Sequence, residues 1–348
     1  MCHSDRWPAV RRAQTLHTPP ILMKVALRAL VAMLGLAAMA AGVGAPKILA
    51  AGPETADKSG LPKYKFTVVT HSTAVRFFVP LRKGAEDAGQ LLGAEVTYTG
   101  PPDFNIQKQI DFIKLAIAQN VDGIATTMPD PIAFNDVVKE AMDRGIPVIA
   151  VNADAPASGR LAYVGQNSYE AGVFMGEEIF KVLRGGHVLL CVRAAGMANM
   201  EARIKGVEET LDRRGQYSYR VVITGTDRVQ AVSLITSALH EDPSIKGMFG
   251  IEEVAGSAIA QIIQRDHLRG KVAAGSFDLV TDILDAIENG ELQFTVAQQP
   301  YVQGFQSVIN LYLLKRYNLT PSDINTSTVS ITWENVATVK EQVAQGYR

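Results

Sequence analysis

Short apolar, β-branched runs alternate with amphipathic stretches of helical periodicity along most of this chain. In the first half, we expect strands at residues 66–70, 95–99, 121–127 and 147–151. We expect helices near residues 81–92, 106–117, 134–144 and 169–183. Glycines follow three of these helices at positions where left-handed backbone commonly ends a helix. Buried strands that alternate with helices are typical of parallel sheets covered on both faces.

The same alternation begins again after residue 186. The expected strands are residues 187–192, 220–224, 247–251, 272–277 and 292–297, with a last one at 329–333. The expected helices are near residues 200–211, 229–239, 254–265 and 279–289, followed by a long one at 301–316. These units are too many for one ordinary sheet, and a polar break lies near residues 163–168. The pattern therefore favours an α/β fold of two doubly wound, Rossmann-like lobes over the alternative, a barrel of eight units.

The N-terminal region has the pattern of an export signal. Lys24 and Arg28 precede an uncharged, Ala-rich run at residues 29–45, which is short for a membrane-spanning helix. We interpret residues 1–51 as a signal region with Met23 as the true start, the alternative being a transmembrane anchor. A polar linker follows at residues 52–62. Cleavage of the signal would place the mature, soluble protein in the periplasm.

Composition and charge narrow the function further. The 348 residues are 47% hydrophobic and 20% charged, with a net charge of −1, as in globular proteins. Most of the basic surplus lies in the N-terminal region, so the body is mildly acidic, and we expect no nucleic-acid partner. Cys2 and Cys191 are too few for a disulfide framework or a cysteine-built zinc site. We expect no metal, no cofactor and no catalytic residues, since the nucleotide-binding, hydrolase and metalloprotease motifs are absent.

Polar or aromatic residues follow nearly every expected strand, where open α/β sheets bind their ligands. These residues are His71, Ser72, Phe77, Phe78, Thr127, Asn152, Asp154, Arg193, Asp227, Glu252, Glu253, Asp278, Gln298 and Gln299, with Asn199 and Arg203 in the following helical turn. Carboxylates and amides can satisfy sugar hydroxyls while aromatic rings pack on C–H faces. Each residue also has a structural alternative, since Asp227 fits a helix cap and the Phe pair fits a core.

Seven segments, in this order, carry a family resemblance. They are VVT…FFVPLRKGAEDAG (68–89), VDGIATTMPDP (121–131), GIPVIAVNAD (145–154), YVGQNSYEAG (163–172), Asn199-x-x-x-Arg203-x-x-Gly206, GSFD (275–278) and VAQQPYVQG (296–304). Together they resemble the periplasmic sugar-binding proteins of the ribose/galactose-binding type, the substrate receptors of ABC importers. The resemblance implies a type I periplasmic binding fold whose lobes close on a ligand through a hinge of three crossings, near Gln166, Gln298 and Thr328.

The resemblance also implies lobe boundaries and residue roles. The N-terminal lobe would hold residues 63–166 and 299–327, and the C-terminal lobe residues 167–298 and 328–348. The implied ligand contacts in the first lobe and at its hinge edge are Phe77, Phe78, Thr127, Asn152 and Gln166, with His71 or Ser72 nearby. Those in the second lobe are Arg203, Glu252, Asp278 and Gln298. The protein would act as a monomer that delivers a sugar or polyol to a membrane permease.

The chain departs from the family pattern at two ligand positions. Glu252 stands where the family usually has Asn, and Asn152-Ala153 stands where it usually has Asp-Arg. The missing pair argues against ribose, unless Asp154 enters the cleft in its place. Another pentose, a hexose or a polyol stays open, whereas Glu252 and Asp278 disfavour an anionic ligand.

Three other functions were weighed against transport. A LacI-type repressor would need a helix-turn-helix where this chain has an export signal, and an enzyme would need a nucleophile or metal set around His71. A periplasmic sensor subunit, which presents its ligand to a chemoreceptor or histidine kinase, would have the same fold and cleft. Adjacent permease or kinase genes would separate transport from sensing.

Overall fold

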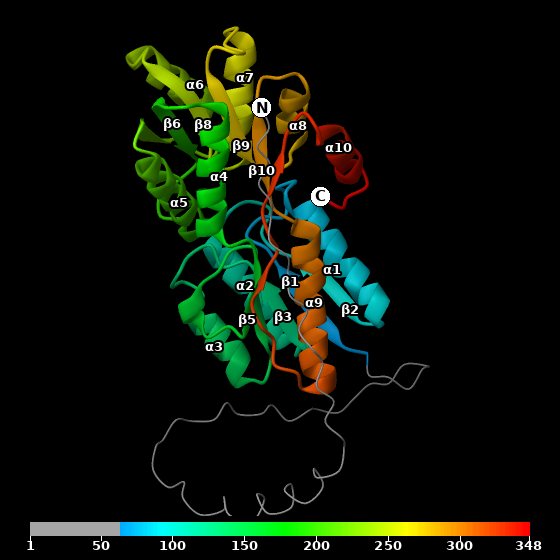
Figure 1. The fold of residues 1–348 in the computed structure, drawn as a ribbon. Helices are drawn as coiled ribbons and strands as arrows, with labels where there is room; N and C mark the ends of the chain where they lie inside the picture. Colours follow the sequence, from blue (N-terminus) through cyan, green and yellow to red (C-terminus); the bar gives the residue numbers. More distant parts are fainter. Residues whose placement is uncertain (1–62) are drawn as a thin grey trace, which may run out of the picture. The chain divides into compact units, whose positions relative to one another are not determined.

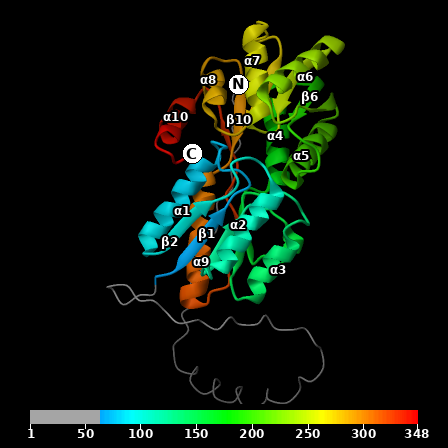
Figure 2. The same ribbon diagram turned by 180° about the vertical axis from the view of Figure 1, so that it is seen from behind.

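The computed structural model describes residues 63–348; the expected signal region and linker lie outside them. These residues form two sheets of six strands each (Figures 1 and 2). The α/β prediction of two doubly wound lobes is therefore confirmed, and the single barrel is excluded. No helix in the described part is long and apolar enough to cross a membrane.

The first lobe is built on a parallel sheet with the strand order β11-β5-β4-β3-β1-β2. Its strands are β1 (Lys65–Val69), β2 (Glu95–Thr99), β3 (Gly123–Thr126), β4 (Val148–Val151), β5 (Ala162–Gly165) and β11 (Ile324–Asn325). Its helices are α1 (Phe78–Leu92), α2 (Ile106–Ala118), α3 (Asn135–Asp143) and α9 (Pro300–Tyr317).

Alternating strand residues cover the two faces of the first sheet. Val68 and Ile149 pack with residues of α1 and α9, whereas their neighbours Val69 and Val148 pack with residues of α2 and α3. Because both faces are buried, the strands read as continuous apolar runs. Gly84 lets α1 approach α9 closely, since a Cβ there would lie 2.0 Å from the Tyr301 carbonyl oxygen.

The second lobe has the strand order β12-β10-β9-β8-β6-β7, and only the β10–β12 pair is antiparallel. Its strands are β6 (Gly186–Val192), β7 (Tyr217–Ile223), β8 (Ile245–Gly250), β9 (Ala273–Phe277), β10 (Phe294–Ala297) and β12 (Val329–Ile331). Its helices are α4 (Ser168–Val182), α5 (Ala198–Arg214), α6 (Arg228–Glu241), α7 (Glu253–Arg265), α8 (Thr281–Glu288) and α10 (Val336–Ala344). Cys191 is a buried, free thiol in β6, and burial raises its pKa.

The chain passes between the lobes three times, between β5 and α4, between β10 and α9, and between β11 and β12. These crossings lie at the predicted positions. Gln166 connects them, because its Nε2 donates to the Ala297 carbonyl (3.2 Å), the Ser327 carbonyl (3.3 Å) and Thr328 Oγ1 (3.1 Å). One buried amide thus ties all three crossings together.

Most predicted elements lie within a few residues of the observed ones, and two strands and one α-helix were missed. The segment interpreted as a polar break contains β5, a four-residue strand at the hinge. The two-residue strand β11 and the helix α10 were not predicted. The strands β5 and β11 are too short to show a clear alternation of apolar and polar residues, so the neighbouring strands with which they pair decide their conformation.

Candidate functional site

A cleft lies at the carboxyl ends of the strands of both sheets. Its lining residues are His71, Val75, Phe77, Phe78, Asn152, Arg193, Met197, Asn199, Met200, Arg203, Glu252, Glu253, Asp278 and Gln298. The first five come from the first lobe, Gln298 lies at a crossing, and the others come from the second lobe.

The wall from the first lobe is aromatic and carries no charge. The Phe78 ring meets Phe77 edge-on at 5.1 Å and His71 at 4.9 Å between ring centroids. The His71 backbone N–H donates to Thr127 Oγ1 at 2.9 Å, and its Nδ1 lies 3.1 Å from the same oxygen. Burial, with a smaller contribution from the charge of Arg193, lowers the pKa of His71 to about 3. The imidazole is therefore neutral at neutral pH.

The wall from the second lobe concentrates charge. Arg193 donates from Nε and Nη2 to one Glu252 oxygen, at 3.0 and 2.8 Å. Burial lowers the pKa of Arg193, but Glu252, Glu253 and Asp278 raise it more, so the group stays charged. Arg203 is 3% exposed, and its guanidinium lies 4.1 Å from the centroid of the Phe277 ring. It donates to the Ile251 carbonyl and to Gln166 Oε1.

Gln298 joins the two walls. Its Nε2 donates to Asp278 Oδ1 at 2.9 Å, and its Oε1 accepts from Asn152 Nδ2 at 3.2 Å. Asn152 (φ 66°) and Asp278 (φ 72°) both adopt left-handed backbone, which Asn and Asp tolerate better than other side chains. The chain thus bends sharply after β4 and after β9 to present these two polar groups.

Three buried polar atoms in the cleft have no hydrogen-bond partner in the described part of the chain. They are Asn199 Oδ1, Arg203 Nε and Glu253 Oε2. A buried polar atom without a partner costs free energy, which a ligand with matching donors and acceptors recovers. Two acceptors and one donor therefore lack partners among the described residues, on side chains that line a cleft whose other wall is aromatic.

Eight of the twelve predicted site residues line this cleft, and four do not. Ser72 donates to the Pro102 carbonyl at 2.7 Å, and Thr127 lies behind His71, completely buried. Gln166 uses its side chain to join the hinge crossings. Asp154 does not line the cleft: the two nitrogens Nε and Nη2 of Arg160 bind it at 2.7 Å each, in a hollow beside β5 and β11 that shares Asn199 with the cleft.

Six lining residues were not among the predicted site residues. Arg193, Asn199 and Glu253 follow strand ends or begin the next helix, so their positions in the sequence carried a signal. Val75, Met197 and Met200 carried none, because isolated apolar residues in a loop or at the start of a helix look like core residues. Asp227, by contrast, caps α6 through the N–H of Gln230, as its structural alternative predicted.

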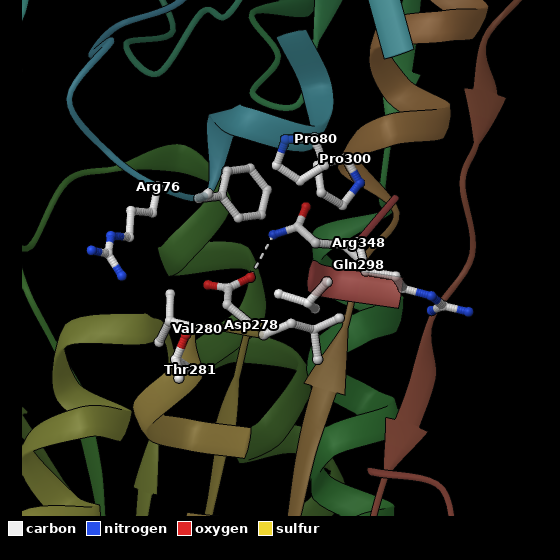
Figure 3. Close-up of a pocket in the computed structure, with 11 residues that line it drawn as sticks. Arg76, Pro80, Asp278, Val280, Thr281, Gln298, Pro300 and Arg348 are labelled. Atoms are coloured by element: carbon white, nitrogen blue, oxygen red, sulfur yellow. Dashed lines mark hydrogen bonds between the residues drawn. The ribbon is translucent and has the colours of Figure 1, made fainter. Parts of the chain in front are cut away.

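A second, more apolar cavity adjoins the cleft and shares Phe77, Asp278 and Gln298 with it (Figure 3). Pro80 and Pro300 lie on one side of the Gln298–Asp278 hydrogen bond, and Val280 and Thr281 on the other. No group of His, Cys, Asp and Glu side chains within residues 63–348 could hold a metal ion.

A family model for a periplasmic binding protein domain matches residues 66–316. This chain belongs to the periplasmic binding protein family. Family membership confirms the resemblance and makes this periplasmic binding protein a solute receptor, not an enzyme.

Similar proteins are known in both archaea and bacteria. The periplasmic binding protein is 32% identical over 293 residues to the xylose/arabinose-binding protein XylF of Sulfolobus acidocaldarius, covering 79% of this chain and 72% of the relative. It is 25% identical to the D-allose-binding periplasmic protein of Escherichia coli, covering 68% and 79%. A solute-binding protein from Burkholderia graminis, solved with D-arabinose, superposes with a TM-score of 0.76 at 28% identity, covering 79% and 97%.

Proposed function

We propose that this protein binds a neutral monosaccharide or polyol in the cleft and delivers it to an ABC import permease. The observation that carries the proposal is the set of three unpartnered polar atoms opposite the aromatic wall. A hydroxyl both donates and accepts, so a ring of hydroxyls can satisfy all three while its C–H face packs on Phe77. The sugars in the names of the relatives support the same ligand class.

Binding would couple to a hinge motion. Residues 63–166 with 299–327 would move as one body, and residues 167–298 with 328–348 as the other. A ligand that contacts both walls stabilises the closed arrangement only through its differential contacts with that state. The permease would then recognise the closed, monomeric protein. Residues 1–51 would direct export and be removed, leaving the receptor in the periplasm.

A thermal-shift panel tests the ligand class. The full chain is expressed in a Gram-negative bacterium and recovered from the periplasm, and its N-terminus is read by mass spectrometry. We expect at least one of D-arabinose, D-xylose, D-allose, D-ribose and myo-inositol to raise the melting temperature. A ligand at a hundredfold excess over its Kd adds about 2.7 kcal/mol of stability.

The control is Asp278→Asn, which keeps the shape of the cleft and removes one carboxylate. It should reduce the shift produced by the active sugar. A flat panel from protein shown to be free of carried-over ligand would contradict a sugar or polyol function, and a retained N-terminal signal would contradict export by cleavage.

A further inference from the structure

Two adjacent glutamates at the start of α7 have different surroundings. Glu252 is the N-cap residue and is 1% exposed. Its two oxygens accept from the N–H groups of Val254 and Ala255, both at 2.8 Å, and from two nitrogens of Arg193. The protein itself therefore uses both oxygens of the Glu252 side chain.

Glu253 has no such set of donors. Its side chain is 14% exposed, and the nearest cation, Arg193 Nη2, lies 3.5 Å from Oε1. Its Oε2 is buried without a partner. Arg193 is held by Glu252 at shorter distances, so it is shared unequally between the two carboxylates.

The charged groups around Glu253 make it costly for Oε2 to lack a hydrogen-bond donor. Glu252 on its own helix and Asp278 after β9 are carboxylates, whereas Arg193 after β6 is the cation beside it. Arg203 of α5 lies in the same cleft, and His71 across the cleft is neutral. Burial, followed by the negative charge of Asp278, raises the pKa of Glu253 to about 7. The long contact with Arg193 leaves Oε2 without a donor among the described residues.

We propose that Glu253, and not Glu252, is a specificity-determining contact that accepts a hydrogen from the ligand, while Glu252 is a positioning residue that holds Arg193. This inference rests on the proposed function of the cleft. A second buried atom in the same cavity supports it, because Arg203 Nε, on a side chain only 3% exposed, also lacks a partner. Glu253 would accept from a ligand hydroxyl or amine, and the surplus of carboxylates would disfavour a sugar acid.

The matched variants Glu253→Gln and Glu252→Gln give opposite expectations for the unliganded protein. The folded pKa of Glu253 lies above the ordinary value of 4.5, so the ionised carboxylate costs stability. That cost is absent below pH 4.5, grows as the pH rises, and is complete above about pH 7. Glu253→Gln should therefore raise the melting temperature at pH 8, by about 2–6 °C, and change it little at pH 4.5. Glu252→Gln should lower it at pH 8, because Arg193 loses its charged partner.

The binding measurement uses isothermal titration with whichever of D-arabinose, D-xylose, D-allose and D-ribose shifts the wild type most. We expect Glu253→Gln to weaken binding about tenfold or more at pH 8, as for a lost hydrogen bond to a charged group. The higher melting temperature shows that such a loss is not misfolding. A stabilised Glu253→Gln that binds the sugar as tightly as the wild type would overturn the proposal.

Failure of the proposed function has a different signature. If none of the four sugars binds the wild type, the sugar function fails, whereas the melting temperatures still decide the division of roles. A melting temperature at pH 8 that rises in Glu253→Gln and falls in Glu252→Gln supports the proposed roles of the two glutamates. A Glu253→Gln variant that melts lower than the wild type overturns them.

Discussion

The two walls of the cleft hold their functional groups in different ways. The first lobe presents neutral rings whose positions follow from packing, since Phe78 is 2% exposed and belongs to the core under α1 and α9. The second lobe presents Arg193, Arg203 and Asp278, whose positions follow from hydrogen bonds and charge. Shape is thus set by one lobe and polarity by the other. Substitution of the buried ring Phe78 in the first wall should therefore affect mainly folding, and substitution of a ligand-contacting side chain in the second wall should affect mainly binding.

The largest effect should come from the aromatic pair in the first wall. Phe78→Ala empties a core position and should cost about 3–5 kcal/mol of unfolding free energy. Phe77→Ala removes a half-buried ring that lines the cleft and should weaken ligand binding far more than stability. Urea unfolding and sugar titration of both variants measure the difference. Equal losses of stability in the two variants would contradict the assignment of Phe78 to the core and Phe77 to the cleft.

A comparable effect on binding should come from the second wall. Arg203→Ala removes a buried guanidinium with an unpartnered Nε, and we expect affinity to fall about 100-fold or more. Lys205→Ala, on the same helix with a side chain 69% exposed, is the matched control and should leave the affinity unchanged. Titration of both variants against the active sugar, after their melting temperatures are compared, decides the outcome. An unchanged affinity in Arg203→Ala would remove this wall from the site.

The two walls should also respond to pH in opposite directions. The folded pKa of His71, about 3, lies below the ordinary value of 6.5. Stability from the neutral ring is therefore complete above pH 6.5 and falls as the pH is lowered toward 3, by at most about 1.4 kcal/mol per pH unit. His71→Gln, which can still bond Thr127, should lose less stability between pH 6.5 and 4.5. Urea midpoints across this interval measure it, and identical slopes in both proteins would contradict the assignment.

The smallest effect should come from the predicted site residue that lies outside the cleft. Asp154→Asn weakens a partly buried ion pair with Arg160, which keeps its bond to Asp323 at 2.8 Å. We expect a loss of about 1 kcal/mol in stability and no change in sugar affinity. Urea unfolding and titration check both parts. A clear loss of affinity would return Asp154 to the ligand site.

The helices and long strands were predictable because their signals are local. Gly93, for example, ends α1 with a left-handed φ of 66°, and the apolar spacing of α2 places Ile113 and Ile117 in the core. The strand β5 was not predictable, because four residues beside a polar hinge show no periodicity of their own. Its conformation follows from pairing with β4 and β11.

The sequence by itself determined the two-lobed α/β fold and the residues at the strand ends, because these follow from periodicity and glycine stops, whereas the three crossings were implied by the family resemblance. Tertiary structure alone decided which polar residues bond within the protein and which line the cleft. An amide such as Gln166 and a carboxylate such as Asp154 could each contact a ligand. In the folded protein, however, Gln166 bonds backbone atoms at the crossings, and Asp154 bonds Arg160. Glu252 and Glu253 are identical in chemistry and adjacent in the chain. Only the donors that surround each carboxylate in the folded protein distinguish Glu252, whose two oxygens are both bonded, from Glu253, whose Oε2 has no partner among the described residues.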